Sequence, residues 1–231
     1  MDTSQYKAIT FDFWGTLVDV ETSGVAAMEA VAARLGADPS RAAAYYQQWD
    51  EATVRGYRSD RWRPYVEWAA FGLRQVFAAQ APAGDWPSLA ETFVADMTRH
   101  AQPHPEAPDV IRFLGERYRL MPITNMDRRF FDANPFRSLF ALTLTAEDVR
   151  AFKPSALIFK AAIERLALEP GEILHVSLAQ FADLEGAMPM GMDVAWINRG
   201  GEPLGRFTPA PKFEFSDLSP LVGLLPGSAT G

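Results

Sequence analysis

Short apolar segments recur along the chain, and in its second half they alternate with segments whose apolar residues follow helical spacing. The apolar segments predict buried strands, and their alternation with helices indicates parallel strands in one sheet. The predicted strands span residues 8–13, 119–124, 140–144, 173–177, 194–198 and 213–215, and the predicted helices lie near 108–117, 155–166 and 181–188.

The stretch from Thr22 to Arg99 follows a different pattern. It is rich in alanine and has helical periodicity, with interruptions where Gly, Pro, Ser and Asp gather, at 36–40, near 59–60 and at 81–85. This pattern predicts roughly four helices and no strand. Because the strand before it is predicted to join the later sheet, the helical stretch is an insertion.

The predicted fold class is therefore α/β, a Rossmann-like parallel sheet core with an inserted α-helical cap domain. We predict that residues 1–18 and 104–225 form the core, that 19–103 form the cap and that 226–231 form a flexible tail. The insertion begins shortly after the first strand. A cap at that point can close over a site and exclude water.

Length and composition agree with one such domain. The 231 residues leave room for an α/β core with a smaller insertion, and the 48% hydrophobic and 22% charged residues exclude a disordered or fibrous chain. The net charge is −7 and charges of both signs are interspersed, which argues against nucleic-acid binding and favours a small-molecule substrate.

The cysteine count and the distribution of apolar residues predict where the protein is located. The chain has no cysteine, so it has neither disulfides nor a thiolate nucleophile. Its first residues lack the basic start and apolar run of a signal peptide, and no later stretch approaches the ~20 apolar residues of a membrane span. We therefore predict a cytoplasmic protein without membrane contact.

Asp12 is the first candidate for chemistry. It ends the first predicted strand and is followed by Gly15-Thr16, which allows a tight turn beside its carboxylate. A carboxylate in this place can act as a nucleophile and form an ester that water later opens. The alternative is an ordinary turn with an Asx hydrogen bond.

Three later features favour the nucleophile. Thr124-Asn125 ends the 119–124 strand with a hydroxyl and an amide, Lys153 precedes a helix, and Asp183 follows the 173–177 strand. These residues offer donors for an anion, a cation for charge stabilisation and a second carboxylate. Each has a structural alternative as a helix cap, a solvated lysine or a first-turn acid, but together they indicate a site.

This ordered set resembles the four motifs of the haloacid dehalogenase superfamily, which match Asp12 with Gly15-Thr16, then Thr124, Lys153 and Asp183. Residues 196–199 are further similar to the strand after the fourth motif in type II 2-haloacid dehalogenases. The resemblance implies a covalent aspartyl ester, water activated near Asp183, charge stabilisation by Lys153, positioning by Thr16 and Thr124, and an Asn125 near the halide or oxyanion. It also implies a possible homodimer.

Trp14 separates two activities within that superfamily. Phosphatases of the superfamily carry a second aspartate there, whereas an indole can neither ligate magnesium nor protonate a leaving alkoxide. Type II dehalogenases usually have a tyrosine at this position. Leu178, where phosphatases often place an acid, points the same way, so no metal and no cofactor are predicted.

Several positions depart from the type II pattern. An arginine usually follows a cap tryptophan in the family, but the best match here is Trp49-Asp50. Other cap arginines, possible substitutes or merely solvated charges, are Arg55, Arg58, Arg61 and Arg63. Gln180 replaces the family's amide, with a different reach. His175 lies inside a strand, and we predict a structural role for it.

The resulting hypothesis is metal-independent dehalogenation of a short 2-haloacid or a related small, anionic substrate. A magnesium-dependent small-molecule phosphatase and a non-catalytic binding protein of this fold are the alternatives. The predicted catalytic residues are Asp12, Lys153 and Asp183, and the predicted substrate-binding residues are Trp14, Thr16, Thr124, Asn125 and Gln180.

Overall fold

The computed structural model describes residues 3–58 and 61–225, and these form two compact units. The sheet unit comprises the described residues of 1–18, 103–124 and 138–231, and the helical unit those of 19–102 and 125–137. The predicted tail at 226–231 and the predicted break near 59–60 lie outside the described residues. No helix in the described part of the chain is long and apolar enough to span a membrane.

The sheet unit contains one parallel sheet with the strand order β5-β4-β1-β6-β7-β8. β1 therefore lies at the centre, where the chain order reverses and ligands bind in open α/β sheets. Its four residues are fully buried, which explains their continuous apolar pattern. The strands are β1 (Ala8–Phe11), β4 (Arg119–Thr124), β5 (Leu144–Thr145), β6 (Ile173–Ser177), β7 (Asp193–Ile197) and β8 (Phe213–Phe215).

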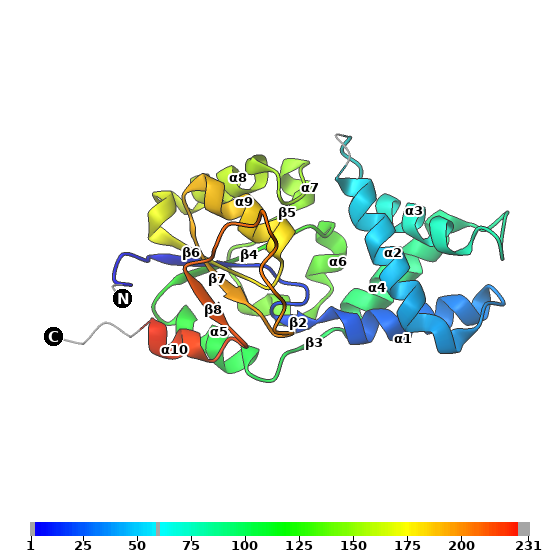
Figure 1. Cartoon of the computed structure of the whole chain (residues 1–231), viewed down its shortest axis with the longest axis horizontal. Helices are drawn as coiled ribbons and strands as arrows, with labels where there is room; N and C mark the ends of the chain where they lie inside the picture. Colours follow the sequence, from blue (N-terminus) through cyan, green and yellow to red (C-terminus); the bar gives the residue numbers. More distant parts are fainter. Residues whose placement is uncertain (1–2, 59–60, 226–231) are drawn as a thin grey trace. The chain divides into compact units, whose positions relative to one another are not determined.

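Helices cover both faces of this sheet. Figure 1 shows α8 and α9 on one face and α5 with α10 on the other. The helices of this unit are α5 (Ala107–Gly115), α7 (Ala146–Val149), α8 (Ala156–Leu166), α9 (Glu185–Ala187) and α10 (Pro220–Leu224), with a π-helical turn at Gln180–Leu184 and short 3₁₀ turns at Pro170–Glu172 and Met188–Met190. The predicted α/β class and parallel sheet are confirmed.

One predicted strand was placed wrongly. Residues 140–144 were expected to pair, but β5 begins only at Leu144. Phe140 is buried outside the strand, with its ring 6.3 Å from that of Phe11 and 6.4 Å from that of Phe13. Its apolar character therefore serves packing between a loop and the first strand, which periodicity cannot distinguish from strand pairing.

The helical unit is built from four longer helices, as the periodicity predicts. Asp19 and Asp85 accept backbone N–H groups as the N-caps of the first and last of them. The helices are α1 (Val20–Arg34), α2 (Ala42–Tyr57), α3 (Tyr65–Phe77) and α4 (Trp86–His100), with 3₁₀ turns at Pro39–Arg41 and Pro135–Leu139 and a short α6 (Arg128–Asp132). Two-residue strands β2 (Val18–Asp19) and β3 (Gln102–Pro103) pair with each other.

The segment 125–137 was predicted to belong to the core, yet it groups with the helices. Asp127 gives the physical reason, because its carboxylate accepts the backbone N–H groups of Tyr65 at 2.6 Å and Val66 at 3.0 Å. Pro64 supplies no side-chain cap to α3, so Asp127 satisfies the open helix end from a distant part of the sequence.

Candidate active site

The carboxyl ends of β1 and β6 bring two acids to one edge of the sheet. Asp12 follows β1 directly, and its backbone N–H donates to the carbonyl of Val176 at 2.9 Å, which continues the pairing of the two strands. Asp183 follows β6 and lies inside the π-helical turn, where its N–H donates to the carbonyl of Ala179. Inserted π-helical turns are often found at functional sites.

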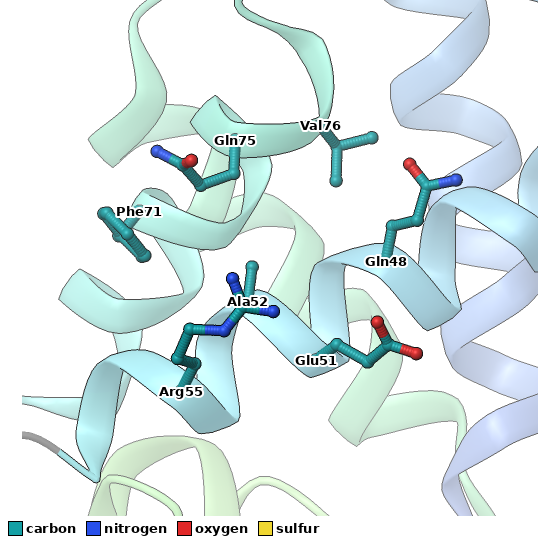
Figure 2. A pocket seen from close by; sticks show the side chains of 7 residues that line it. All are labelled: Gln48, Glu51, Ala52, Arg55, Phe71, Gln75 and Val76. Atoms are coloured by element: carbon teal, nitrogen blue, oxygen red, sulfur yellow. The ribbon is translucent and has the colours of Figure 1, made fainter.

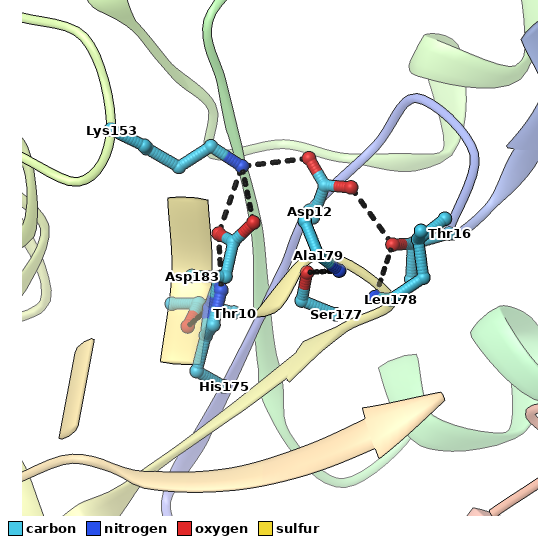
Figure 3. Close-up of polar contacts among 9 residues, drawn as sticks. All are labelled: Thr10, Asp12, Thr16, Lys153, His175, Ser177, Leu178, Ala179 and Asp183. Carbon is cyan, nitrogen blue, oxygen red and sulfur yellow. Dashed lines mark hydrogen bonds and ion pairs between the residues drawn. The ribbon is translucent and has the colours of Figure 1, made fainter. Parts of the chain in front are cut away.

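Lys153 joins these two carboxylates. Its Nζ lies 2.7 Å from Oδ1 of Asp12 and 2.9 and 3.1 Å from the two oxygens of Asp183 (Figure 3). Only 2% of the Lys153 side chain is exposed, so these contacts lie in a low-dielectric environment. The structure thus brings together the three residues predicted to be catalytic.

Thr16 fixes the second oxygen of Asp12. Its hydroxyl donates to Oδ2 of Asp12 at 2.8 Å and accepts the backbone N–H of Leu178 at 2.9 Å (Figure 3). Gly15 makes this turn possible, because its φ is +83° and a Cβ there would lie 2.6 Å from a methyl carbon of Leu178. With Lys153 on one oxygen and Thr16 on the other, the carboxylate of Asp12 cannot rotate freely.

The pKa values of the two acids shift in opposite directions although both acids are buried beside Lys153. Burial raises the pKa of Asp12, and the negative charge of Asp183 adds to that rise, while Lys153 opposes both. For Asp183, burial acts upward, but Lys153 and then His175 outweigh it and lower its pKa to about 2. Despite burial, the two carboxylates raise the pKa of Lys153 and keep it cationic. Charge is therefore least favourable on Asp12.

The two acids also differ in the exposed fraction of their side chains. The side chain of Asp12 retains 10% of its accessible surface, whereas that of Asp183 retains none. Asp12 is therefore the more accessible of the two acids, and Asp183 is fully buried. Conversion of Asp12 to an uncharged ester also removes the less favourable of the two buried charges.

Three further residues that are predicted to bind substrate lie at or just after the carboxyl ends of β1 and β4 in the sequence. Trp14 is half-buried, two residues after Asp12, and packs its ring 4.9 Å from that of Phe13. Thr124 is buried at the last position of β4, the strand beside β1, and Asn125 is half-buried directly after it. Their contact with a substrate stays a prediction.

Gln180 contacts a neighbouring loop, and its predicted contact with a substrate stays a prediction. Its side-chain amide donates to the carbonyl of Pro203 at 3.1 Å, and its oxygen accepts the N–H of Gly205 at 2.7 Å. Both ends of the amide are therefore used to hold the loop after β7. An amide residue in a loop carries no sequence signal that distinguishes these uses.

Sequence reasoning missed the groups that support the nucleophile turn. Arg199 donates to the carbonyl of Thr16 at 3.0 Å and pairs with Glu106 at 2.7 Å, and a ring nitrogen of His104 lies 2.9 Å from the carbonyl of Gly15. These side chains come from two separate segments, one around residues 104–106 and one directly after β7. The sequence marks Arg199 only as part of the segment 196–199, which is similar to type II dehalogenases.

The helical unit holds the remaining charged candidates. Asp50 lies on α2 with an accessible side chain, and partial desolvation followed by the charges of Glu51 and Glu21 raises its pKa to about 6. The neighbouring Trp49 is buried and donates its indole N–H to the carbonyl of Ala69 at 3.0 Å. It therefore serves the core of this unit.

The predicted cap arginines have separate surroundings. The guanidinium of Arg63 stacks 5.0 Å above the ring of Trp68. Arg55 lines a surface hollow of about 240 Å³ between α2 and α3 (Figure 2). The other side chains around that hollow are Gln48, Glu51, Ala52, Phe71, Gln75 and Val76. This open, mixed surface contains none of the three predicted catalytic residues.

The sequence match to a known family covers most of both the sheet and the helical insertion. The family model described as haloacid dehalogenase-like hydrolase matches residues 6–186. The chain belongs to this family. The resemblance predicted from the four motifs is thereby confirmed, and the chain is a haloacid dehalogenase-like hydrolase.

Full-length relatives of this hydrolase include two dehalogenases. The (S)-2-haloacid dehalogenase of Pseudomonas sp. (strain YL) is 28% identical, with 96% of each chain covered. (S)-2-haloacid dehalogenase 4A of Burkholderia cepacia is 25% identical over 95% of this chain and 91% of its own. The fold of the L-2-haloacid dehalogenase from Xanthobacter autotrophicus is shared at a TM-score of 0.81 and 21% identity, with 97% and 100% of the two chains covered.

Proposed function

We propose that this hydrolase removes halide from a short 2-haloacid, with Asp12 as the nucleophile and a covalent ester as the intermediate. The observation that carries the proposal is the carboxylate of Asp12, which is buried except for 10% of its side-chain surface and is held by Lys153 and Thr16. A fixed carboxylate at the carboxyl end of a central strand is suited to attack on a bound substrate. The two dehalogenase relatives support the same substrate class.

The proposed reaction has two steps. An oxygen of Asp12 attacks the α-carbon of the haloacid, the new C–O bond forms, and the halide leaves with the electrons of the C–halogen bond. Water then attacks the carbonyl carbon of the Asp12 ester, Asp183 accepts a proton from it, and the ester opens. The 2-hydroxyacid departs with that proton on its new hydroxyl, and the carboxyl group of Asp12 loses a proton to solvent.

Lys153 supports a reaction without a metal ion. Its ammonium already lies within 3 Å of both carboxylates and supplies positive charge where a divalent cation would have to bind. Trp14 adds no oxygen ligand or proton donor beside them. We therefore propose that the enzyme needs no cofactor. Its predicted homodimer and cytoplasmic location stay predictions.

A paired assay tests this function. We expect chloride release from 2-chloropropionate that is unaffected by a chelator, and no magnesium-dependent phosphate release from p-nitrophenyl phosphate. Hydrolysis of the phosphate ester only with magnesium, together with an untouched haloacid, would establish the phosphatase alternative. Failure to hydrolyse either compound would instead favour the non-catalytic alternative or another substrate.

Asp50 provides a test of carboxylate recognition. If it occupies the place of the family arginine, Asp50→Arg should lower the KM for 2-chloropropionate about three- to tenfold, because a repulsive charge becomes attractive. Glu29→Arg is the matched control, since Glu29 is exposed on α1 and is not among the charges that raise the pKa of Asp50. Equal KM values for wild type and Asp50→Arg would show that Asp50 does not face the substrate.

A further inference from the structure

His175 is a buried titratable residue that the proposed mechanism leaves unused. It lies in β6 with no exposed surface, and the ring of Phe159 packs perpendicular to it at 5.7 Å. Its Nε2 lies 2.8 Å from Oδ1 of Asp183, and its Nδ1 lies 2.8 Å from the hydroxyl of Thr10 (Figure 3). Both ring nitrogens are thus engaged inside the sheet unit.

The chemistry of the partners fixes the direction of these contacts. The low pKa of Asp183 keeps it ionised, and an ionised carboxylate only accepts hydrogen bonds. Nε2 of His175 must therefore carry a proton and donate it to Oδ1. In a neutral ring Nδ1 is then an acceptor, and the hydroxyl of Thr10 donates to it, which selects this tautomer.

The two oxygens of Asp183 are consequently not equivalent. Oδ1 accepts from both His175 and Lys153, whereas Oδ2 accepts only from Lys153, at 3.1 Å, among the described residues. Oδ2 keeps capacity for a further donor. Among the described residues, the hydrogen bonds of His175 go to Thr10 and Asp183, while the oxygens of Asp12 are held by Lys153 and Thr16.

We infer that His175 is a positioning residue for the second step, because it holds Asp183 through Oδ1 and leaves Oδ2 to accept a proton from the water that opens the Asp12 ester. The inference rests on the proposed function. It separates two tasks within one cluster. Lys153 and Thr16 prepare Asp12 for attack, and His175 with Thr10 prepares Asp183 for hydrolysis of the ester.

Two amide substitutions separate the two ring nitrogens. The amide nitrogen of Gln in His175→Gln reaches the depth of Nε2 and can still donate to Asp183. In His175→Asn the amide nitrogen reaches only the depth of Nδ1 and leaves Asp183 without this donor. The two variants are matched in chemistry and differ in reach by one methylene group.

The readout is the rate of each step in a single turnover of 2-chloropropionate, quenched over time and followed by mass spectrometry of the peptide that contains Asp12. For His175→Asn we expect ester formation within about threefold of wild type and hydrolysis slowed about tenfold or more, as loss of one charge-assisted hydrogen bond predicts. The ester should therefore accumulate. His175→Gln should hydrolyse it within about threefold of the wild-type rate.

Other outcomes overturn the inference. Wild-type hydrolysis in His175→Asn would do so, and so would equal slowing of both steps in the two variants together with a lower Tm, which is the pattern of a purely structural residue. A wild-type enzyme that turns over without forming the ester would overturn the proposed mechanism and this inference together. An ester that forms and is hydrolysed normally in both variants would overturn only the role of His175.

Discussion

Asp12→Asn should lower turnover of 2-chloropropionate by about 10⁴-fold or more, since an amide cannot replace the carboxylate as nucleophile and removal of a nucleophile costs about that much in other hydrolases. The substitution changes one atom of the side chain. Thr16 and Lys153 surround this position from two sides, so the geometry of the turn should persist.

The same substitution should not destabilise the fold at neutral pH. The folded pKa of Asp12 is raised above its ordinary value, so its ionised form is disfavoured by folding. Its contribution to stability is therefore greatest at low pH and falls as the pH rises through the folded pKa. Asparagine resembles the protonated form, and the variant should match or exceed the wild-type Tm at pH 7, with the difference shrinking on acidification.

Labelled water identifies the role of Asp12 directly. A single turnover in oxygen-18 water should place the label in the Asp12 carboxylate, because water attacks the ester at its carbonyl carbon and the product keeps an oxygen from the enzyme. Label found only in the 2-hydroxyacid would mean that water attacks the substrate directly. If the Asp12→Asn variant does not fold, labelling of the wild-type enzyme still decides whether Asp12 is the nucleophile.

The sequence carried most of the information on the catalytic cluster because its residues follow strand ends. Asp12 follows a buried apolar strand, and parallel strands bring their carboxyl ends to one edge of the sheet. The sequence alone therefore predicts that Asp183 lies near Asp12. Lys153 was harder to place, since it precedes a helix. The family resemblance supplied that position, and the contacts in the structure agree with it.

Contacts between distant side chains were not predictable from periodicity. A structural role was predicted for His175 because a lone histidine in a strand usually has one, and the sequence gives no sign of Thr10 and Asp183, the partners that its two nitrogens contact. Residues 104–225 were all predicted to lie in the core, but the carboxylate of Asp127 caps α3 in the helical unit. Gln180 reads as a site amide in a loop, and its side chain holds another loop. In each case tertiary hydrogen bonding decides the role.

Lys153→Met should lower the free energy of unfolding at neutral pH by about 3–5 kcal/mol, because it leaves two buried carboxylates without their shared cation. It should also abolish dehalogenation, since Lys153 is the cation that contacts the carboxylate of Asp12 among the described residues and is proposed to hold it for attack. Lys160→Met is the control. Lys160 is exposed on α8, and its ion pair with Glu164 is a long surface contact of 3.9 Å. Its loss should therefore change stability by no more than about 1 kcal/mol.

The pH dependence distinguishes a lost charge from lost packing. The folded pKa of Lys153 is raised, so its stabilisation is fully present below the ordinary lysine pKa of about 10.4 and is lost only as the pH rises through the folded value. Without Lys153 the pKa values of both carboxylates should rise, and protonation near pH 5 should restore part of the variant's stability relative to wild type. Denaturant unfolding at pH 7 and pH 5 measures this recovery. In a second experiment, adding Asp183→Asn to Lys153→Met should reduce the loss of unfolding free energy at pH 7. A destabilisation that is equal at both pH values and unaffected by Asp183→Asn would assign the effect to packing of the lysine stem instead of its charge.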